Sequence, residues 1–181
     1  MSSVANRLAF EKAPDKWAEN PFLLKHIKRS DRVLEIGCSS GRVLSQIEAA
    51  ERVGVDTDGA AIERGRKDYP ELTLIHGDGR DYLNGYDVLI LSHVLEHIDG
   101  PREFLSSLDF SRIYVEVPDF DTDALNHVRV ARGRSLVYTD ADHVAEFDRE
   151  GLEALFTEAG LEVVDSEFRW GVMRYWVRPA R

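Results

Sequence analysis

The chain has 181 residues, which fits one compact domain over 1–181 and excludes a large multidomain enzyme. Charged residues make up 31% and hydrophobic residues 43%, as in an ordinary globular protein with a sizeable core. The formal net charge of −10 repels phosphate backbones, so nucleic acid is a poor candidate partner. Residues 1–10 lack the pattern of a secretion signal, no apolar run reaches the ~18 residues of a membrane span, and the single cysteine, Cys38, cannot form an internal disulfide. We therefore expect a cytoplasmic protein.

Short apolar runs rich in β-branched residues alternate with stretches of helical period. The runs at 32–37, 52–56, 72–76, 86–92 and 112–117 predict buried strands. The stretches at 41–50, 59–69 and 101–108 predict helices, and Pro101 suits the start of the third. Such alternation is typical of a parallel sheet with helices on both faces.

The C-terminal part departs from this alternation. Asp148 can cap a helix with apolar residues at i, i+3, i+4 and i+7, and Gly160 stands where such a helix would end. The runs at 161–168 and 172–177 are too close together for a helical crossover, so they predict an antiparallel hairpin. The prediction is an α/β fold, a Rossmann-like doubly wound sheet of seven strands with one antiparallel strand at its C-terminal edge. Residues 1–30 and 118–147 remain as a cap segment and a lid over the strand ends.

Small residues follow the first predicted strand in the segment EIGCSSG (35–41). Such a turn lets a ligand approach main-chain amides at the start of the next element. Asp56 ends the second strand 19 residues after Gly37, where a carboxylate can accept hydrogen bonds from both hydroxyls of a ribose. A dinucleotide fingerprint GxGxxG would need glycine at Ser39 and Arg42, so a nicotinamide-dependent oxidoreductase is the weaker alternative.

The ExGxxxG pattern resembles the first motif, (D/E)xGxGxG, of the class I S-adenosylmethionine-dependent methyltransferases, with Ser39 at the middle glycine. Three further segments resemble the family in the same order: VGVD (53–56), HGDG (76–79) and YDVLILSHVLEHI (86–98). The run 142–164 is similar to its small-molecule branch. The resemblance implies S-adenosyl-L-methionine as cofactor, bound by Glu35, Gly37, Cys38, Ser39, Gly41, Asp56, Thr57, Asp78, Gly79, Ser92 and His93.

The resemblance implies transfer of a methyl group to a small molecule by in-line displacement, with oxygen slightly favoured over nitrogen or carbon as acceptor. An alcohol or phenol must also lose a proton, for which histidine is the natural base. His143 is the first candidate, followed by His97 and Glu116. His143 could instead be a capping or packing residue. A catalytically inactive module that only binds the cofactor also stays open, and the oligomeric state is left open.

Other patterns have competing interpretations. HVLEH (93–97) matches a zinc-peptidase motif, but that motif needs a helix and this one follows a buried strand. Residues Asp140, Asp142, His143 and Glu146 could bind a divalent ion, but their spacing fits no named motif, and we assign no metal ligand. Three arginines could contact an acceptor or simply be solvated: Arg129, Arg132 and Arg134. Five aromatic residues could line an acceptor pocket or pack in the core: Trp17, Phe22, Trp170, Tyr175 and Trp176.

Overall fold

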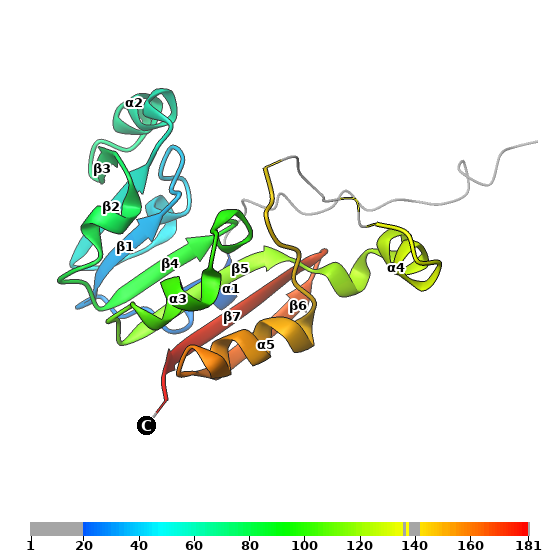
Figure 1. Ribbon diagram of the computed structural model, residues 1–181. Helices are drawn as coiled ribbons and strands as arrows, with labels where there is room; N and C mark the ends of the chain where they lie inside the picture. The colour runs from blue at the N-terminus through cyan, green and yellow to red at the C-terminus, as the bar shows by residue number, and fades with distance from the viewer. Residues whose placement is uncertain (1–19, 136, 138–141, 181) are drawn as a thin grey trace, which may run out of the picture.

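The computed structural model describes residues 20–135, 137 and 142–180. Its sheet has seven strands in the order β3-β2-β1-β4-β5-β7-β6 (Figure 1). The strands are β1 (Arg32–Ile36), β2 (Glu51–Asp56), β3 (Thr73–His76), β4 (Val88–Ser92), β5 (Arg112–Pro118), β6 (Leu161–Arg169) and β7 (Val172–Pro179). The first five are parallel, and β7 pairs antiparallel with both β5 and β6. The predicted α/β class is confirmed, and its one reversed strand is the second from the edge.

The helices are α1 (Pro21–Leu24), α2 (Gly59–Asp68), α3 (Pro101–Ser106), α4 (Ala124–Ala131) and α5 (Arg149–Glu158). Asp148 caps α5 as predicted, because its carboxylate accepts a hydrogen bond from the Gly151 amide at 2.7 Å. The predicted helix at 41–50 is wrong. A single 3-10 turn, η2 (Leu44–Gln46), stands there, and Ile47 is already extended. The apolar spacing in this stretch instead reflects the burial of Leu44 and Ile47 in the core.

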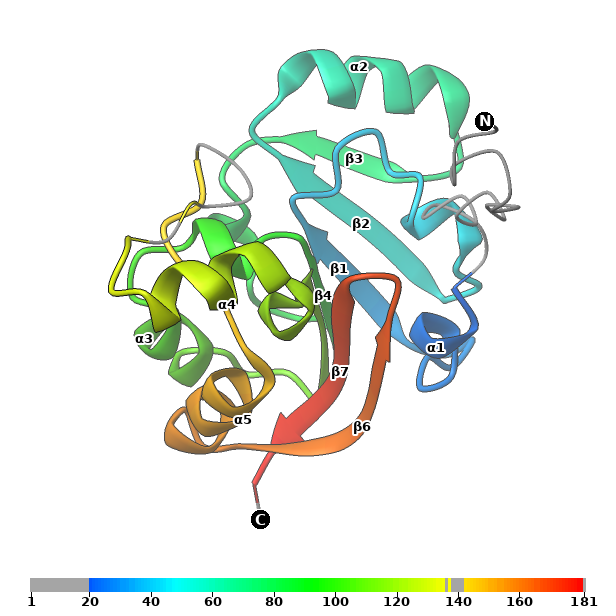
Figure 2. The ribbon, with the colours of Figure 1, turned by 90° about the vertical axis from the view of Figure 1, so that its right-hand side faces the viewer.

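Alternate residues of the strands supply two separate cores, one on each face of the sheet. Val33 of β1 packs on the face that also holds Ile62 of α2. Its neighbour Leu34 packs on the opposite face with Leu105 of α3 and Phe156 of α5. Figure 2 shows α2 on one side of the sheet and α3 and α5 on the other. Both faces are therefore covered, which leaves the strand ends as the place for a ligand.

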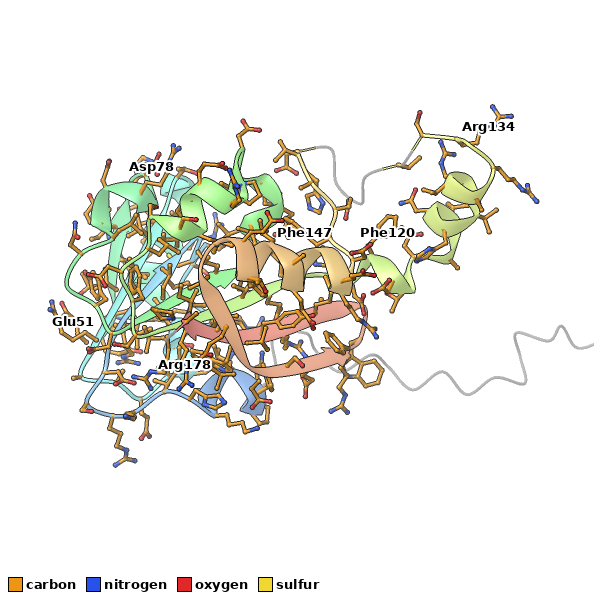
Figure 3. All side chains as sticks on the ribbon, turned by 60° about the horizontal axis from the view of Figure 1, so that its bottom comes forward. Glu51, Asp78, Phe120, Arg134, Phe147 and Arg178 are labelled. Carbon is orange, nitrogen blue, oxygen red and sulfur yellow. The ribbon has the colours of Figure 1, made fainter. Side chains whose placement is uncertain are left out.

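The segment after β5 leaves the sheet and returns to it. The turn η5 (Phe120–Thr122) leads into α4, which stands beyond the end of β5 in Figure 1. The Phe120 amide donates to the Phe147 carbonyl at 3.1 Å, which ties the beginning and end of the segment together. Figure 3 shows Arg134 at its outer end. Most of the predicted cap at 1–30, including Trp17, and also Asp140 lie outside the described residues.

In the described ranges, no helix combines the length and the apolar character needed to cross a bilayer.

Candidate active site

A pocket of about 410 Å³ lies at the carboxyl ends of β1 and β4. These neighbouring strands run parallel, and the chain continues from β1 to β2 on the other side, so the strand order reverses here. The pocket is lined by Glu35, Gly37, Cys38, Ser39, Ser40, Arg42, Val43, Ser92 and His93. Six of the residues predicted to bind the cofactor thus share one pocket wall, although they come from two separate segments.

The loop after β1 requires glycine at its first position. Gly37 has φ +69°, and a Cβ atom there would lie 2.6 Å from Cγ2 of Val94. Gly41 also has a positive φ, +78°. Ser39 adopts φ +49° although it is not a glycine. The loop thus keeps left-handed backbone at the position where the family motif has its middle glycine.

Asp56 joins this loop to the end of β2. Its carboxylate accepts hydrogen bonds from the Ser39 amide and the Asp58 amide, each at 2.7 Å. Thr57 follows, and its carbonyl lies 3.1 Å from Nε2 of His76 at the end of β3. A carboxylate has about four lone-pair sites, so Asp56 keeps capacity for ribose hydroxyls beside the pocket.

Asp78 and Gly79 form the turn after β3. The Asp78 carboxylate accepts from the Arg80 amide at 3.0 Å and pairs with the Arg80 guanidinium, which lowers the pKa of Asp78 to about 2. Gly79 packs against β1, since a Cβ there would lie 2.5 Å from Cγ2 of Ile36. The turn therefore holds an ionised carboxylate next to the first strand.

Glu35 is an acid in the pocket wall that lacks full hydrogen bonding. It is 2% exposed, and its Oε2 atom has no hydrogen-bond partner in the part of the chain that the structure describes. Burial raises the pKa of Glu35 well above its usual value. A buried carboxyl group with an open oxygen suits a ligand that brings an ammonium group.

Cys38 lies in the same wall but is not suited to attack a substrate. The residue is 5% exposed, and burial, assisted by the charges of Glu35 and Asp56, raises the pKa of its thiol. The thiolate is therefore scarce at neutral pH. Cys38 serves as a small packing residue against Gly54, where a Cβ would lie 2.7 Å from Sγ.

His93, directly after β4, also lines the pocket and has φ +55°. Its Nε2 lies 3.3 Å from Oε1 of Glu116, and its Nδ1 lies 3.3 Å from Oε1 of Glu96. Burial lowers the pKa of His93, but the two carboxylates outweigh it and raise the pKa to about 9. The imidazole is therefore charged at neutral pH.

Glu116 on β5 is held by cations and donors. Tyr114 donates its hydroxyl to Oε2 at 2.6 Å, and Arg174 donates its Nε to the same oxygen at 2.7 Å. Burial raises the pKa of Glu116, but His93, Tyr114 and Arg174 together lower it to about 2. Such a group is a weak proton acceptor at neutral pH. Sequence reasoning missed Arg174, which faces Glu116 only because β7 pairs with β5.

His97 and His143 come together beyond the end of β4. Their rings are 4.8 Å apart and nearly perpendicular, at 82°. Nδ1 of His97 lies 3.2 Å from the Asp142 carbonyl, and Nδ1 of His143 lies 3.1 Å from Oε1 of Glu146. Of the three residues predicted to be catalytic, two are thus adjacent, whereas Glu116 contacts His93.

The structure also shows where the zinc-peptidase motif and the candidate aromatic residues lie. Residues Leu95–His97 form a 3-10 turn, η4, so the helix needed for the zinc-peptidase motif is not formed. Tyr175 and Trp176 are almost fully buried and pack in the two cores. Trp170, in contrast, is 57% exposed in the turn before β7.

Known proteins resemble this chain in sequence. A family model described as a methyltransferase domain matches residues 8–166. The chain is 27% identical over 112 residues to the ribosomal protein L11 methyltransferase of Thermotoga neapolitana, which covers 60% of this chain and 38% of that protein. It is 36% identical over 89 residues to the mitochondrial ubiquinone biosynthesis O-methyltransferase of Schizosaccharomyces pombe, covering 42% and 32% respectively. The matches thus span about a third of the length of these relatives.

Solved structures resemble the fold. The small RNA methyltransferase HEN1 has a TM-score of 0.68 and 19% identity, covering 88% of this chain and 24% of that one. The magnesium protoporphyrin IX methyltransferase of Synechocystis, solved with S-adenosylhomocysteine, has a TM-score of 0.59 and 17% identity, covering 83% and 74%. The family model spans most of the chain, including the residues that line the pocket and the acids Asp56 and Asp78. This chain therefore belongs to the methyltransferase domain family, whose methyl donor is S-adenosylmethionine.

Proposed function

We propose that the chain catalyses methyl transfer from S-adenosylmethionine to an oxygen atom of a small molecule. The observation that carries the proposal is that the pocket and the histidine-containing turn both lie at the end of β4. The pocket wall with Glu35, Ser92 and His93 lies at the end of β4, and the turn with His97 follows directly after that strand. A cofactor site and a group of imidazoles therefore adjoin one another.

On the cofactor side, the protein's task is binding and orientation. Asp56 would accept hydrogen bonds from the ribose hydroxyls, and Asp78 would accept one from the adenine amino group. The open oxygen of Glu35 would pair with the ammonium group of the methionine part. The cofactor supplies a methyl group on a sulfonium, which leaves by in-line displacement. The chain's main contribution is to hold the acceptor in line in a dry pocket.

On the acceptor side, charge favours an oxygen nucleophile. His93 is charged at neutral pH, and both of its ring nitrogens face carboxylates, so it would act on an acceptor oxygen by its positive charge and not by a hydrogen bond. Glu116 acts as a positioning residue that keeps His93 charged and in place. We propose that His97 and His143 meet the acceptor hydroxyl and take part in the loss of its proton.

The surface near the acceptor side favours a small, partly apolar molecule over RNA. A hollow of about 360 Å³ lies under α4, lined among others by Phe120, Val130 and Phe147, and Glu146 borders it. Leu125 of α4 is 68% exposed. The chain's net charge of −10 opposes a polyanion. The expected cytoplasmic location stays a prediction.

The test is a product screen with a labelled methyl donor. The panel contains phenols, hydroxy acids, amines, carbon acids and a short RNA, and calorimetry with S-adenosylhomocysteine and with NADH precedes it. We expect tight binding of S-adenosylhomocysteine alone and label on a small hydroxyl compound. Label on the RNA alone would refute the acceptor class, binding of NADH alone would favour an oxidoreductase, and cofactor binding without any product would indicate an inactive module.

A variant of His143 examines the acceptor side separately. His143→Ala is expected to lower turnover at least about tenfold while the affinity for S-adenosylhomocysteine stays unchanged, since the ring does not line the cofactor pocket. His127→Ala, an exposed histidine on α4, is the matched control. Full activity of His143→Ala would place the proton acceptor elsewhere.

A further inference from the structure

Three side chains of the metal-binding kind meet beyond the end of β4. Glu96 and His97 belong to the turn η4, and His143 comes from the segment that returns from α4 to α5. Each offers one potential ligand atom, and these atoms all lie within 4.8 Å of one another. The main chain holds the two segments together, because the amides of Val144 and Ala145 donate to the Glu96 carbonyl at 2.9 and 3.2 Å.

Glu96 is a buried carboxylate whose two oxygens lack hydrogen bonds within the described part of the chain. The residue is 1% exposed, and neither of its carboxylate oxygens has a hydrogen-bond partner among the residues that the structure describes. Nδ1 of His93 lies 3.3 Å from Oε1, within the distance of an ion pair but without the geometry of a hydrogen bond. An unsatisfied buried carboxylate is costly, and a bound cation would remove that cost.

The two histidines are oriented in the way typical of metal ligands. Nδ1 of His97 contacts the Asp142 carbonyl at 3.2 Å, and Nδ1 of His143 contacts a carboxylate oxygen of Glu146 at 3.1 Å. Metal-binding histidines commonly use one ring nitrogen for such a partner and the other for the ion. The Glu146 side chain is itself only 2% exposed, so this partner is fixed.

We propose that Glu96, His97 and His143 bind one divalent transition-metal ion. Two imidazoles and a carboxylate suit Zn²⁺, Co²⁺, Mn²⁺ or Fe²⁺, whereas Mg²⁺ and Ca²⁺ prefer sites made of oxygen ligands. Binding would draw the three ligand atoms, which now lie within 4.8 Å of one another, to one centre.

The role of this site in catalysis rests on the function proposed above. An ion with three protein ligands would have a coordination position left for the acceptor hydroxyl. Binding there would lower the pKa of that hydroxyl. His97 and His143 would then hold the ion and would not take the proton, which the more acidic hydroxyl would release to solvent water. Loss of turnover in His143→Ala follows from either role, but only the metal role makes turnover sensitive to a chelator.

The test of binding needs neither cofactor nor acceptor. The full chain is freed of metal by a chelator and titrated with Co²⁺, whose visible absorption reports its ligands, and then with Zn²⁺ by calorimetry. We expect saturation at a single ion per chain. His97→Ala and His143→Ala should each weaken binding by at least about 100-fold, Glu146→Gln by about 10 to 100-fold, and His127→Ala not at all.

Glu96→Gln keeps the shape of the buried side chain and should also weaken Co²⁺ binding. Circular dichroism and the unfolding temperature of each variant show whether it is folded. If Glu96→Gln does not fold, Glu146→Gln still tests the site, because it leaves all three ligands in place. Absence of Co²⁺ binding, or binding that none of these variants weakens, would overturn the metal site.

The two proposals fail in different ways. Specific Co²⁺ binding without methylation of any small molecule would leave the site standing and refute the proposed function. Methylation that continues unchanged after the metal has been removed would support the proposed function and refute the metal's part in it.

Discussion

Replacing Asp56 by alanine should weaken cofactor binding and loosen the loop together. The carboxylate accepts two main-chain hydrogen bonds of 2.7 Å, from Ser39 and Asp58. A hydrogen bond to a charged group contributes about 1.5 to 3 kcal/mol, and partial exposure reduces this, so we expect a net loss of roughly 2 kcal/mol in unfolding free energy. For a chain of this size that lowers the unfolding temperature by about 4 to 8 °C.

The same substitution removes the acceptor for the ribose hydroxyls. Loss of a charge-assisted contact of about 1.5 to 3 kcal/mol weakens binding of S-adenosylhomocysteine by roughly 10 to 100-fold. Isothermal calorimetry measures the affinity, and circular dichroism measures the unfolding temperature.

The control for this prediction is Asp58→Ala. Asp58 caps α2 by accepting from the Ala60 and Ala61 amides at 2.9 and 3.1 Å, and losing such a cap costs about 1 kcal/mol. This variant should lose stability but keep its affinity for S-adenosylhomocysteine. Equal losses of affinity in both variants would show that loop folding, and not a ribose contact, explains the effect. Unchanged affinity in Asp56→Ala would show that the ribose lies elsewhere.

Further predictions concern the two walls of the site. Gly37→Ala places a Cβ 2.6 Å from Val94 at φ +69°, so we expect loss of stability by about 1 to 3 kcal/mol and little remaining cofactor affinity; normal affinity would contradict the loop geometry. Cys38 should react with a thiol reagent at pH 8 at least about 100-fold more slowly in the folded than in the unfolded chain, because it is buried and its pKa is raised. The pKa of Glu116 is lowered from 4.5 to about 2 in the folded chain. The ionised Glu116 therefore stabilises the fold fully above pH 4.5, and this stabilisation is lost as the pH falls toward 2. Glu116→Gln is expected to lower the free energy of unfolding by roughly 3 to 5 kcal/mol at pH 7. In urea unfolding at pH 3.5, the difference in this free energy between the variant and the unmodified chain should be smaller. An equal difference at both pH values would contradict the prediction.

The sequence was sufficient to predict most of the sheet and to name six residues that line one pocket. Buried parallel strands appear as short continuous apolar runs, so β1 to β5 could be located to within about two residues. Their carboxyl ends meet at the same edge, which is why Glu35, Asp56 and Asp78 could be assigned to neighbouring positions. These assignments depend on local sequence and on one topological rule.

Features that depend on long-range packing were harder to predict. The stretch 41–50 has helical spacing, but Gly41 has a positive φ and Ile47 is extended, and burial of Leu44 accounts for the spacing. Arg174 could not be matched to Glu116 without the register of β5 and β7. Propensity and spacing describe one segment at a time, whereas these contacts join segments.

The histidine cluster shows the same limit most clearly. The sequence contains two separate metal-like patterns. HVLEH at 93–97 matches a zinc-peptidase motif but follows a strand, and the group of acids around His143 fits no named motif. In the fold, each pattern contributes only part of a cluster: Glu96 and His97 from the first, and His143 from the second. The two parts meet because amides at 144 and 145 bind the carbonyl of Glu96. A metal site assembled from two loops therefore becomes visible only when the path of the segment between β5 and α5 is known.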